Sequence, residues 1–193
     1  MKEFFKNLGR YKVSSTLNIL GLGIAFAAAY AILVQVNYDL SFNRSLKDSE
    51  RVFRLEHARF SESEDGNLCD YMNDPLGQYL GEDTSMVEAF GRMNCTPSPL
   101  NLKLLVNGEE QIVEIMESWG TEGAPEALGF TLVCGSFDRL STPNSILMSE
   151  KFARTHGLEL DDVVQDVKGR LLTIVGVFED FPKNCDYHGI QMY

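Results

Sequence analysis

The stretch NILGLGIAFAAAYAILVQV, from Asn18 to Val36, contains no charged residue and decides how the chain is organised. It lies within a longer uncharged run of 26 residues, from Val13 to Tyr38. An α-helix rises 1.5 Å per residue and the hydrocarbon core of a bilayer is about 30 Å thick, so about 20 apolar residues are enough to cross it. A buried helix of this length in a soluble protein normally has a polar face. The run therefore predicts a transmembrane helix over residues 13–38.

A cleaved secretory signal is the alternative interpretation of the same stretch. Four Lys or Arg residues among the first twelve form a basic n-region, and the small residues Ala27–Ala29 offer an Ala-x-Ala cleavage site. The apolar run nevertheless continues from Ile32 to Val36, past this site, whereas the apolar region of a cleaved signal has only about 7–15 residues. We therefore favour an uncleaved membrane anchor.

The charges beside the apolar run predict its orientation. Basic residues that flank a span tend to stay in the cytoplasm, and the first twelve residues contain four Lys or Arg and one Glu. We therefore expect the N-terminus to lie inside and residues 39–193 to lie outside. Because Phe4, Phe5 and Leu8 are interspersed with basic residues, residues 1–12 are expected to form a cytoplasmic segment at the membrane interface.

Small residues recur every four positions along the predicted span. They let helix backbones approach each other closely, although Gly and Ala are also common in spans that have no helical neighbour. We favour packing against further helices. The two rows are Gly21, Ala25 and Ala29, and Gly23, Ala27 and Ala31, and the candidate helix-packing residues are Gly21, Gly23, Ala25, Ala27 and Ala29.

The segment after the span is acidic. Residues 39–193 contain 13 Lys or Arg and 27 Asp or Glu, which gives a net charge of −14. Such a surface repels phosphate backbones, and the segment has no cluster of basic and aromatic residues, so we expect no nucleic-acid binding. The excess carboxylates are expected to form a solvated face.

Four cysteines, Cys69, Cys95, Cys134 and Cys185, all fall in the segment predicted to lie outside. Disulfides persist in that environment, and four cysteines allow three pairings. Their wide spacing identifies no framework, so free thiols and bridges both remain open. The sequence contains no CxxC motif, which gives zinc-ribbon and thioredoxin-like sites no support.

The first part of the outer segment is predicted to contain a strand and a short helix. Arg51–Phe60 alternates apolar and charged residues as a strand does, and Ser61–Asn67 is rich in turn-forming residues. Asp74 and Pro75 are typical of an N-cap and a first helical position, and Gly81 is typical of a helix end.

The strongest local pattern predicts a β-hairpin. Two β-rich runs, Leu100–Val106 and Glu110–Met116, flank Asn107-Gly108, which is the preferred pair for a type I′ turn.

The last part of the chain is predicted to contain two strands and a helix. Ser145–Met148 is expected to be a strand, followed by a helix with Ser149 as its N-cap and Gly157 at its end. Leu171–Phe178 is expected to be a second strand, closed by a turn at Pro182. Because strands and short helices alternate irregularly, we predict one mixed α+β domain over residues 39–193.

Sequence motifs of common enzyme classes are absent. The three histidines do not form an H-E-x-x-H motif, and neither G-x-x-x-x-G-K-[ST] nor G-x-S-x-G occurs. We therefore expect no catalytic residue, cofactor or metal site, and no ATP hydrolysis by this chain.

Three weaker patterns are candidate sites. The Cys185, Asp186 and His188 triplet has the spacing of a metal-binding turn, but a single local triplet is more often chance. The paired carboxylates are more simply explained as solvated surface. Trp119 lies in a Gly-rich stretch, where it would line a groove, although a lone aromatic residue beside a loop is more often an edge of the core. The carboxylate pairs are Glu109 with Glu110 and Asp161 with Asp162.

Several longer stretches resemble one family. These are FFKNLGRYKVSSTLNILGLGIAFAAAYAILVQVNYDLSFNR followed by SERVFRLE, and then DPLGQYL, PNSILMSEKFAR and LLTIVGVFEDFPKNC. In content and order they are similar to the N-terminal span and the periplasmic core of MacB/FtsX-like ABC transporter permeases. NILGLGIA together with GVFEDFPKN is the most specific pair.

This resemblance implies a non-ATPase membrane subunit in the bacterial inner membrane, with residues 39–193 in the periplasm. It implies a separate nucleotide-binding ATPase subunit, further permease spans, and a homodimer or larger complex as partners. Such permeases couple ATP hydrolysis to motion of an extracytoplasmic domain and have three more spans after that domain. The sequence has no second hydrophobic span before Tyr193, so we expect a fragment with an incomplete domain.

Two other functions remain open from the sequence. One is a single-span anchored protein of the periplasm or cell surface that binds a partner through its acidic face. The other is a secreted enzyme released by cleavage at Ala29. A neighbouring gene for a nucleotide-binding ATPase would favour the transporter subunit.

Overall fold

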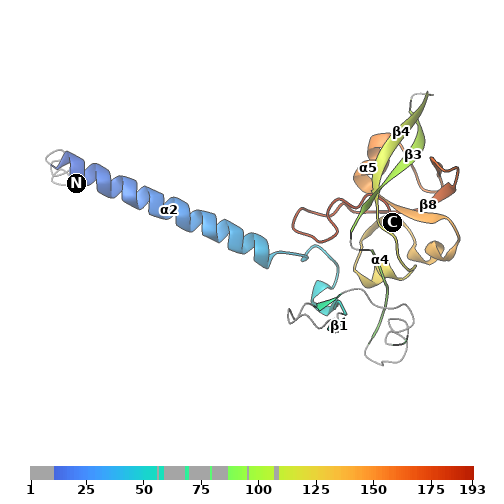
Figure 1. The fold of residues 1–193 in the computed structure, drawn as a ribbon, viewed down its shortest axis with the longest axis horizontal. Helices are drawn as coiled ribbons and strands as arrows, with labels where there is room; N and C mark the ends of the chain where they lie inside the picture. Colours follow the sequence, from blue (N-terminus) through green and yellow to red (C-terminus); the bar gives the residue numbers. More distant parts are fainter. Residues whose placement is uncertain are drawn as a thin grey trace. The chain divides into compact units, whose positions relative to one another are not determined.

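The computed structural model describes residues 11–55, 57–58, 68–69, 79, 87–94, 96–106 and 109–193. The chain divides into two compact units, Met1–Phe42 and Asn43–Tyr193. In the first unit, helix α2 spans Lys12–Leu40 and has no buried residue (Figure 1). The helical conformation predicted for residues 13–38 is therefore confirmed, with one further residue at its start and two at its end, and its crossing of a membrane stays a prediction.

The second unit contains a six-stranded sheet, a separate two-stranded pair and short helices, which confirms the α+β class. Its elements are the 3₁₀ helix η1 (Ser49–Arg51), β1 (His57–Ala58), β2 (Leu68–Cys69), β3 (Ser98–Val106), β4 (Glu109–Glu117), α4 (Ala124–Ala127), β5 (Leu132–Gly135), the 3₁₀ helix η2 (Phe137–Ser141), β6 (Ser145–Ser149), α5 (Glu150–His156), β7 (Val163–Asp166) and β8 (Leu171–Phe178).

The strands of the larger sheet form a closed ring. β4 pairs with β3, β3 with β7, and β7 with β8, all antiparallel, and β8 then pairs in parallel with β6. Residues 191–193 complete the circle between β6 and β4. Leu147 and Tyr193 exchange two backbone hydrogen bonds of 2.8 and 2.9 Å, and the Ser118 N–H donates to Met192 O at 2.9 Å. β5 pairs with the last residues of β8. It lies on the same edge of β8 as β7, which pairs with the first residues of that strand.

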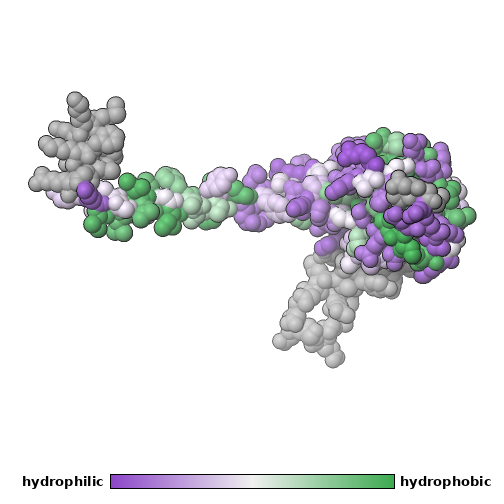
Figure 2. All heavy atoms as spheres, turned by 90° about the horizontal axis from the view of Figure 1, so that it is seen from above, coloured by the Kyte–Doolittle hydropathy of each residue, from purple (hydrophilic) through white to green (hydrophobic). Residues whose placement is uncertain are grey.

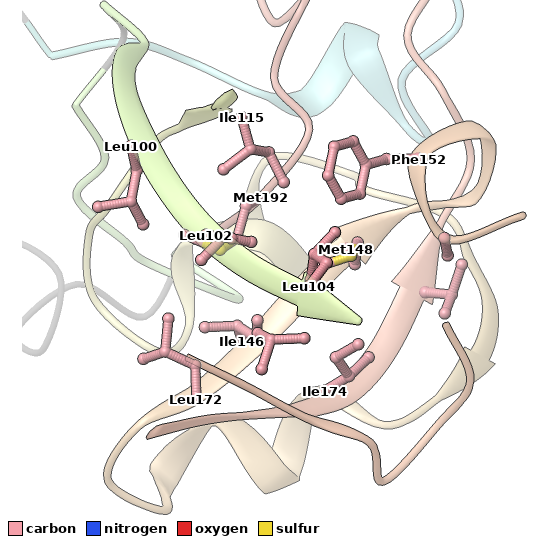
Figure 3. Packing of buried hydrophobic residues seen from close by; sticks show 13 residues of the cluster. Leu100, Leu102, Leu104, Ile115, Ile146, Met148, Phe152, Leu172, Ile174 and Met192 are labelled. Atoms are coloured by element: carbon pink, nitrogen blue, oxygen red, sulfur yellow. The ribbon is translucent and has the colours of Figure 1, made fainter. Parts of the chain in front are cut away.

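The interior of the ring holds the main hydrophobic cluster. Every strand of the ring contributes to it, and α5 adds Phe152 and Ala153 (Figure 3). The alternation of the strands explains this arrangement, because every second residue of β3 points to the same side. The buried members are Leu100, Leu102, Leu104, Ile115, Ile146, Met148, Phe152, Ala153, Val164, Leu172, Ile174, Val177 and Met192.

A second cluster packs on the outer side of β6 and β8. Its centre is Phe130, whose ring centroid lies 4.7–6.2 Å from those of Phe178, Phe181, Tyr187 and Tyr193. Both sides of β6 and β8 are therefore covered. This explains why their sequences, SILMS and LLTIVGVF, are nearly continuous apolar runs and do not alternate with polar residues.

The predicted hairpin and the predicted elements near the end of the chain are confirmed. β3 and β4 pair from Ser98↔Glu117 to Val106↔Glu109 and extend beyond the rest of the domain (Figure 1). Ser149 caps α5 by accepting the Phe152 N–H at 3.4 Å, and Gly157 ends the helix with φ of 64°. The turn residues 107–108 lie outside the described part of the chain.

The predicted strand over Arg51–Phe60 is wrong for most of its described length. Arg51 ends the helix η1, residues 52–55 have no regular structure, and only His57–Ala58 is a strand, paired with Leu68–Cys69. The apolar residues of this segment do not pack inward, since Phe53 is 82% exposed, so the alternating pattern has no core to face. The predicted loop 61–67 lies outside the described residues, as does the predicted helix after Asp74, apart from the helical Tyr79.

Replacing Leu102 by Ala should lower the free energy of unfolding by about 2–5 kcal/mol, because the side chain is fully buried inside the ring and its removal leaves a cavity. Ile112→Ala is the matched control, since Ile112 is 65% exposed on the neighbouring strand and its loss should change stability by about 0.5 kcal/mol or less. Urea denaturation of the chain measures both. Equal losses for the two variants would contradict the ring interior as the core.

Candidate functional site

Helix α2 has the dimensions of a membrane span. Its 29 residues correspond to a length of about 43 Å at 1.5 Å per residue, which exceeds the hydrocarbon thickness of about 30 Å. By length and composition it is able to cross a membrane, and none of its side chains is buried in the protein. Figure 2 shows hydrophobic side chains along its surface. The large apolar side chains of α2 are thus exposed along the helix.

The helical geometry places the two rows of small residues on opposite sides of α2. Successive residues turn by about 100°, so Gly21 and Gly23 point about 200° apart, and each row follows its own glycine. No atom outside the local helix lies within 4 Å of the position that a Cβ would take on either glycine. Both rows are thus free within the chain to meet another helix.

The first residues of the second unit are tied to the rest of that unit. The Asn43 N–H donates to Asn184 O at 2.8 Å, and its side chain exchanges two hydrogen bonds with Asp186, of 2.7 and 2.9 Å. Leu46 is buried in the Phe130 cluster. The Lys47 N–H then donates to Gly129 O at 3.0 Å.

A close contact at Gly129 also holds the backbone of Lys47. This glycine has φ of +74°, and a Cβ on it would lie 2.3 Å from Lys47 O. Any other residue would have to move the backbone, so the glycine is required for the contact.

Trp119 lies beside a hollow of about 210 Å³ at one end of the ring. The segment after β4, η2, the first residues of β6 and β8, and residues 192–193 line it. The structure therefore favours the first of the two interpretations of Trp119, a groove-lining residue. The lining residues are Glu117, Ser118, Trp119, Gly120, Glu122, Leu140, Ser145, Ile146, Arg170, Leu172, Met192 and Tyr193.

Two polar interactions fix residues that line this hollow. The Tyr193 hydroxyl donates to Thr121 O at 2.6 Å, and burial raises the pKa of Tyr193, so the hydroxyl stays protonated. Arg170 pairs through Nε with the fully buried Asp166 carboxylate at 2.6 Å. The N–H groups of Lys168 and Arg170 also donate to that carboxylate, each at 2.8 Å. Burial raises the pKa of Asp166, but the hydrogen bonds and charge of Arg170 outweigh it, so the pKa lies below its ordinary value.

The candidate acidic pairs make local surface contacts. Glu109 and Glu110 are exposed, and Glu110 lies 3.5 Å from Lys103. Asp161 pairs with Arg139, and Asp162 accepts the Glu159 N–H at 2.7 Å.

The Cys185, Asp186 and His188 triplet is engaged in separate contacts. The Cys185 thiol is buried, and burial raises its pKa. Asp186 binds Asn43, and His188 Nδ1 lies 3.1 Å from Phe181 O. No group of three or more His, Cys, Asp or Glu residues able to hold a metal occurs in the described ranges. Cys134 and Cys185 are both free, Cys134 exposed on β5.

The sequence of the chain matches the family model of the MacB-like periplasmic core domain over residues 15–190. The chain belongs to this family. The match begins within α2 and continues almost to the end of the second unit, so it covers the span and the domain together. It supports a permease component of an ABC-type transporter. A comparison with curated proteins finds no match.

Two solved structures are similar to the chain. One is a domain from Porphyromonas gingivalis described as that of a permease protein, with 24% identity and a TM-score of 0.48 over 61% of this chain and 54% of that chain. The other is the extracellular domain of the ABC-type transporter YknZ from Gram-positive bacteria, with 16% identity and a TM-score of 0.37 over 51% of this chain and 50% of that chain. The chain thus spans about half the length of the structures it matches.

Replacing Asp166 by Asn should lower the free energy of unfolding of the domain at neutral pH, and this loss should become smaller in acid. A carboxyl whose pKa is lower in the folded state stabilises the fold above its unfolded pKa, near 3.8, and this contribution is lost as the pH falls through the lower folded value. Urea denaturation of both forms between pH 7 and pH 2.5 measures the difference, which should narrow below pH 3.8. A difference that is constant with pH would contradict a stabilising charge at Asp166.

Proposed function

We propose that the chain acts as a non-ATPase membrane subunit of an ABC-type transporter or mechanotransmission complex. In this proposal, α2 crosses the bacterial inner membrane with its N-terminus in the cytoplasm, and residues 39–193 lie in the periplasm. A separate nucleotide-binding ATPase subunit supplies the energy, and further permease spans, in a homodimer or larger complex, surround α2.

The observation that carries the proposal is the extent of the family match. One match includes both the apolar helix and the domain that follows it, which supports a span and a periplasmic core acting in one subunit. The fastening of Asn43, Leu46 and Lys47 adds a physical route for coupling. Because these three residues tie the segment to the domain, motion of the chain after α2 would be passed to the 184–186 loop and the Phe130 cluster.

We also propose that the small-residue rows of α2 pack against the partner spans. Lipid tails provide no hydrophobic drive for helices to associate, so close van der Waals contact has to supply the stabilisation, and small residues permit it. The rows on opposite sides of α2 would accommodate two neighbours at once.

Labelling of Cys134 tests the orientation. In a Cys69→Ser, Cys95→Ser background the remaining thiols are Cys134, which is exposed, and Cys185, which is buried. A maleimide that crosses the outer membrane but not the inner membrane should label this chain in intact cells, because the proposal places β5 in the periplasm.

Two controls make the labelling decisive. Cys134→Ser should abolish it. In that triple variant, an added Lys6→Cys should be labelled only after the cells are lysed. Labelling of Cys134 only after lysis would overturn the orientation, and a mature protein that starts at Tyr30 and is soluble would overturn the anchor.

Gly21→Leu with Ala25→Leu should weaken association of α2 with partner spans. The larger side chains would separate the helix backbones. Disulfide or chemical crosslinking in membranes, with the other spans supplied on a second polypeptide, measures the effect. Ile19→Phe with Leu33→Phe enlarges the surface between the two rows and is the matched control. Equal crosslinking in all three chains would show that the small residues are only general span composition.

A further inference from the structure

Trp119, the single tryptophan of the chain, is 57% exposed although the backbone that carries it is held on both sides. The Asn94 N–H donates to Trp119 O at 2.8 Å, and the Ser118 N–H donates to Met192 O at 2.9 Å. The Thr121 N–H donates to Arg92 O at 2.8 Å. The exposure of the indole is therefore a property of an ordered segment with several tertiary hydrogen bonds.

Gly120 shows how tightly this segment is packed. A Cβ at this position would lie 2.1 Å from Arg92 O and 2.6 Å from the Tyr193 hydroxyl. The backbone next to Trp119 thus lies directly against its neighbours, and the large side chain is left outside. Exposed aromatic residues on a rigid surface are characteristic of the residues that dominate binding interfaces.

Buried apolar residues form part of the lining of the hollow beside Trp119. They are Ile146, Leu172 and Met192, and all three belong to the cluster inside the ring, where Figure 3 shows them. This part of the lining is therefore as well fixed as the core of the domain. A bound group would meet a preformed surface.

The rim of the hollow has an excess of negative charge. Glu117 and Glu122 line it, and its one cationic residue, Arg170, is already paired with the buried carboxylate of Asp166. The whole outer segment has a net charge of −14, which reinforces this sign. A cation is attracted to the negative face of a Trp ring, and nearby carboxylates add ion pairing.

The hollow is smaller than most sites for small-molecule ligands. Sites for drug-sized ligands usually measure about 300–1,000 Å³, and this hollow has about 210 Å³. It is large enough for one long side chain. We propose that the hollow is a docking site for a protein partner, which inserts a cationic Arg or Lys side chain over the Trp119 ring between Glu117 and Glu122. This site does not depend on the packing of α2 or on coupling to an ATPase.

The fluorescence of Trp119 tests the proposal directly, because no other tryptophan contributes. The full chain in detergent micelles is titrated with N-acetyl-arginine methylamide as the probe. N-acetyl-citrulline methylamide, which has nearly the same shape and no charge, is the control ligand. We expect a saturable change of emission with the arginine probe and at least a tenfold weaker response to citrulline.

A matched pair of variants separates the site from the general acidity of the domain. Glu117→Gln with Glu122→Gln should weaken binding of the arginine probe about tenfold, which corresponds to about 1.4 kcal/mol. Glu109→Gln with Glu110→Gln removes the same charge from the hairpin and should change binding less than twofold. Both variants retain Trp119, and equal urea midpoints confirm that they fold.

Three outcomes would overturn the proposal. Equal weakening in the two variants would assign binding to bulk charge. A response to anionic lipid vesicles with none to the arginine probe would assign Trp119 to a membrane surface. A change of emission on dilution, without any probe, would assign the hollow to contact with a second copy of the chain.

Discussion

Residues 191–193 lie between β6 and β4, and the backbone hydrogen bonds that they make on both sides hold the domain together. Without them, β4 and β6 would be unpaired edge strands of an open sheet, and the cluster around Leu102 would be exposed to solvent between these two strands. The same stretch also makes contacts outside the ring. The Tyr193 ring packs against Phe130, and the Tyr193 hydroxyl donates a hydrogen bond to Thr121 O. Both hydrophobic clusters and the segment that carries Trp119 therefore depend on this short stretch.

The two units of the chain differ in how their apolar side chains are buried. The second unit has two internal clusters, whereas α2 has no buried side chain. At the start of the second unit, Asn43 binds Asp186 and Leu46 is buried in the Phe130 cluster, so the first residues of the domain are held by its core.

Local sequence patterns were sufficient where neighbours in the chain determine the structure. The uncharged run predicted α2, Asn107-Gly108 between β-rich runs predicted the β3–β4 hairpin, and Ser149 with Gly157 predicted both ends of α5. Elements that depend on distant partners were missed. β5 and β7 are only four residues long. Each forms a strand because it pairs with β8, β7 with its first residues and β5 with its last.

The candidate site shows the same division. The sequence indicates Trp119 as a candidate because it is a single tryptophan in a Gly-rich stretch, but the hollow beside it is built from segments that begin at residues 117, 140, 145, 170 and 192. The closure of the ring by residues 191–193 brings these segments together, and no local pattern in that short stretch signals it. The strand predicted over Arg51–Phe60 failed for the opposite reason. Its alternation is real, but Phe53 and Leu55 find no apolar surface to cover.

Closure of the ring also bears on how the domain avoids self-association. Unpaired strand edges are templates on which another chain can add a strand, and closing a sheet removes them. Among the described strands of the ring, the outer part of β4 stays unpaired on one side, and there Glu109, Glu110 and Glu114 place charges that repel a second copy of the same strand. The charged residues along this edge would therefore disfavour the addition of a strand from another chain.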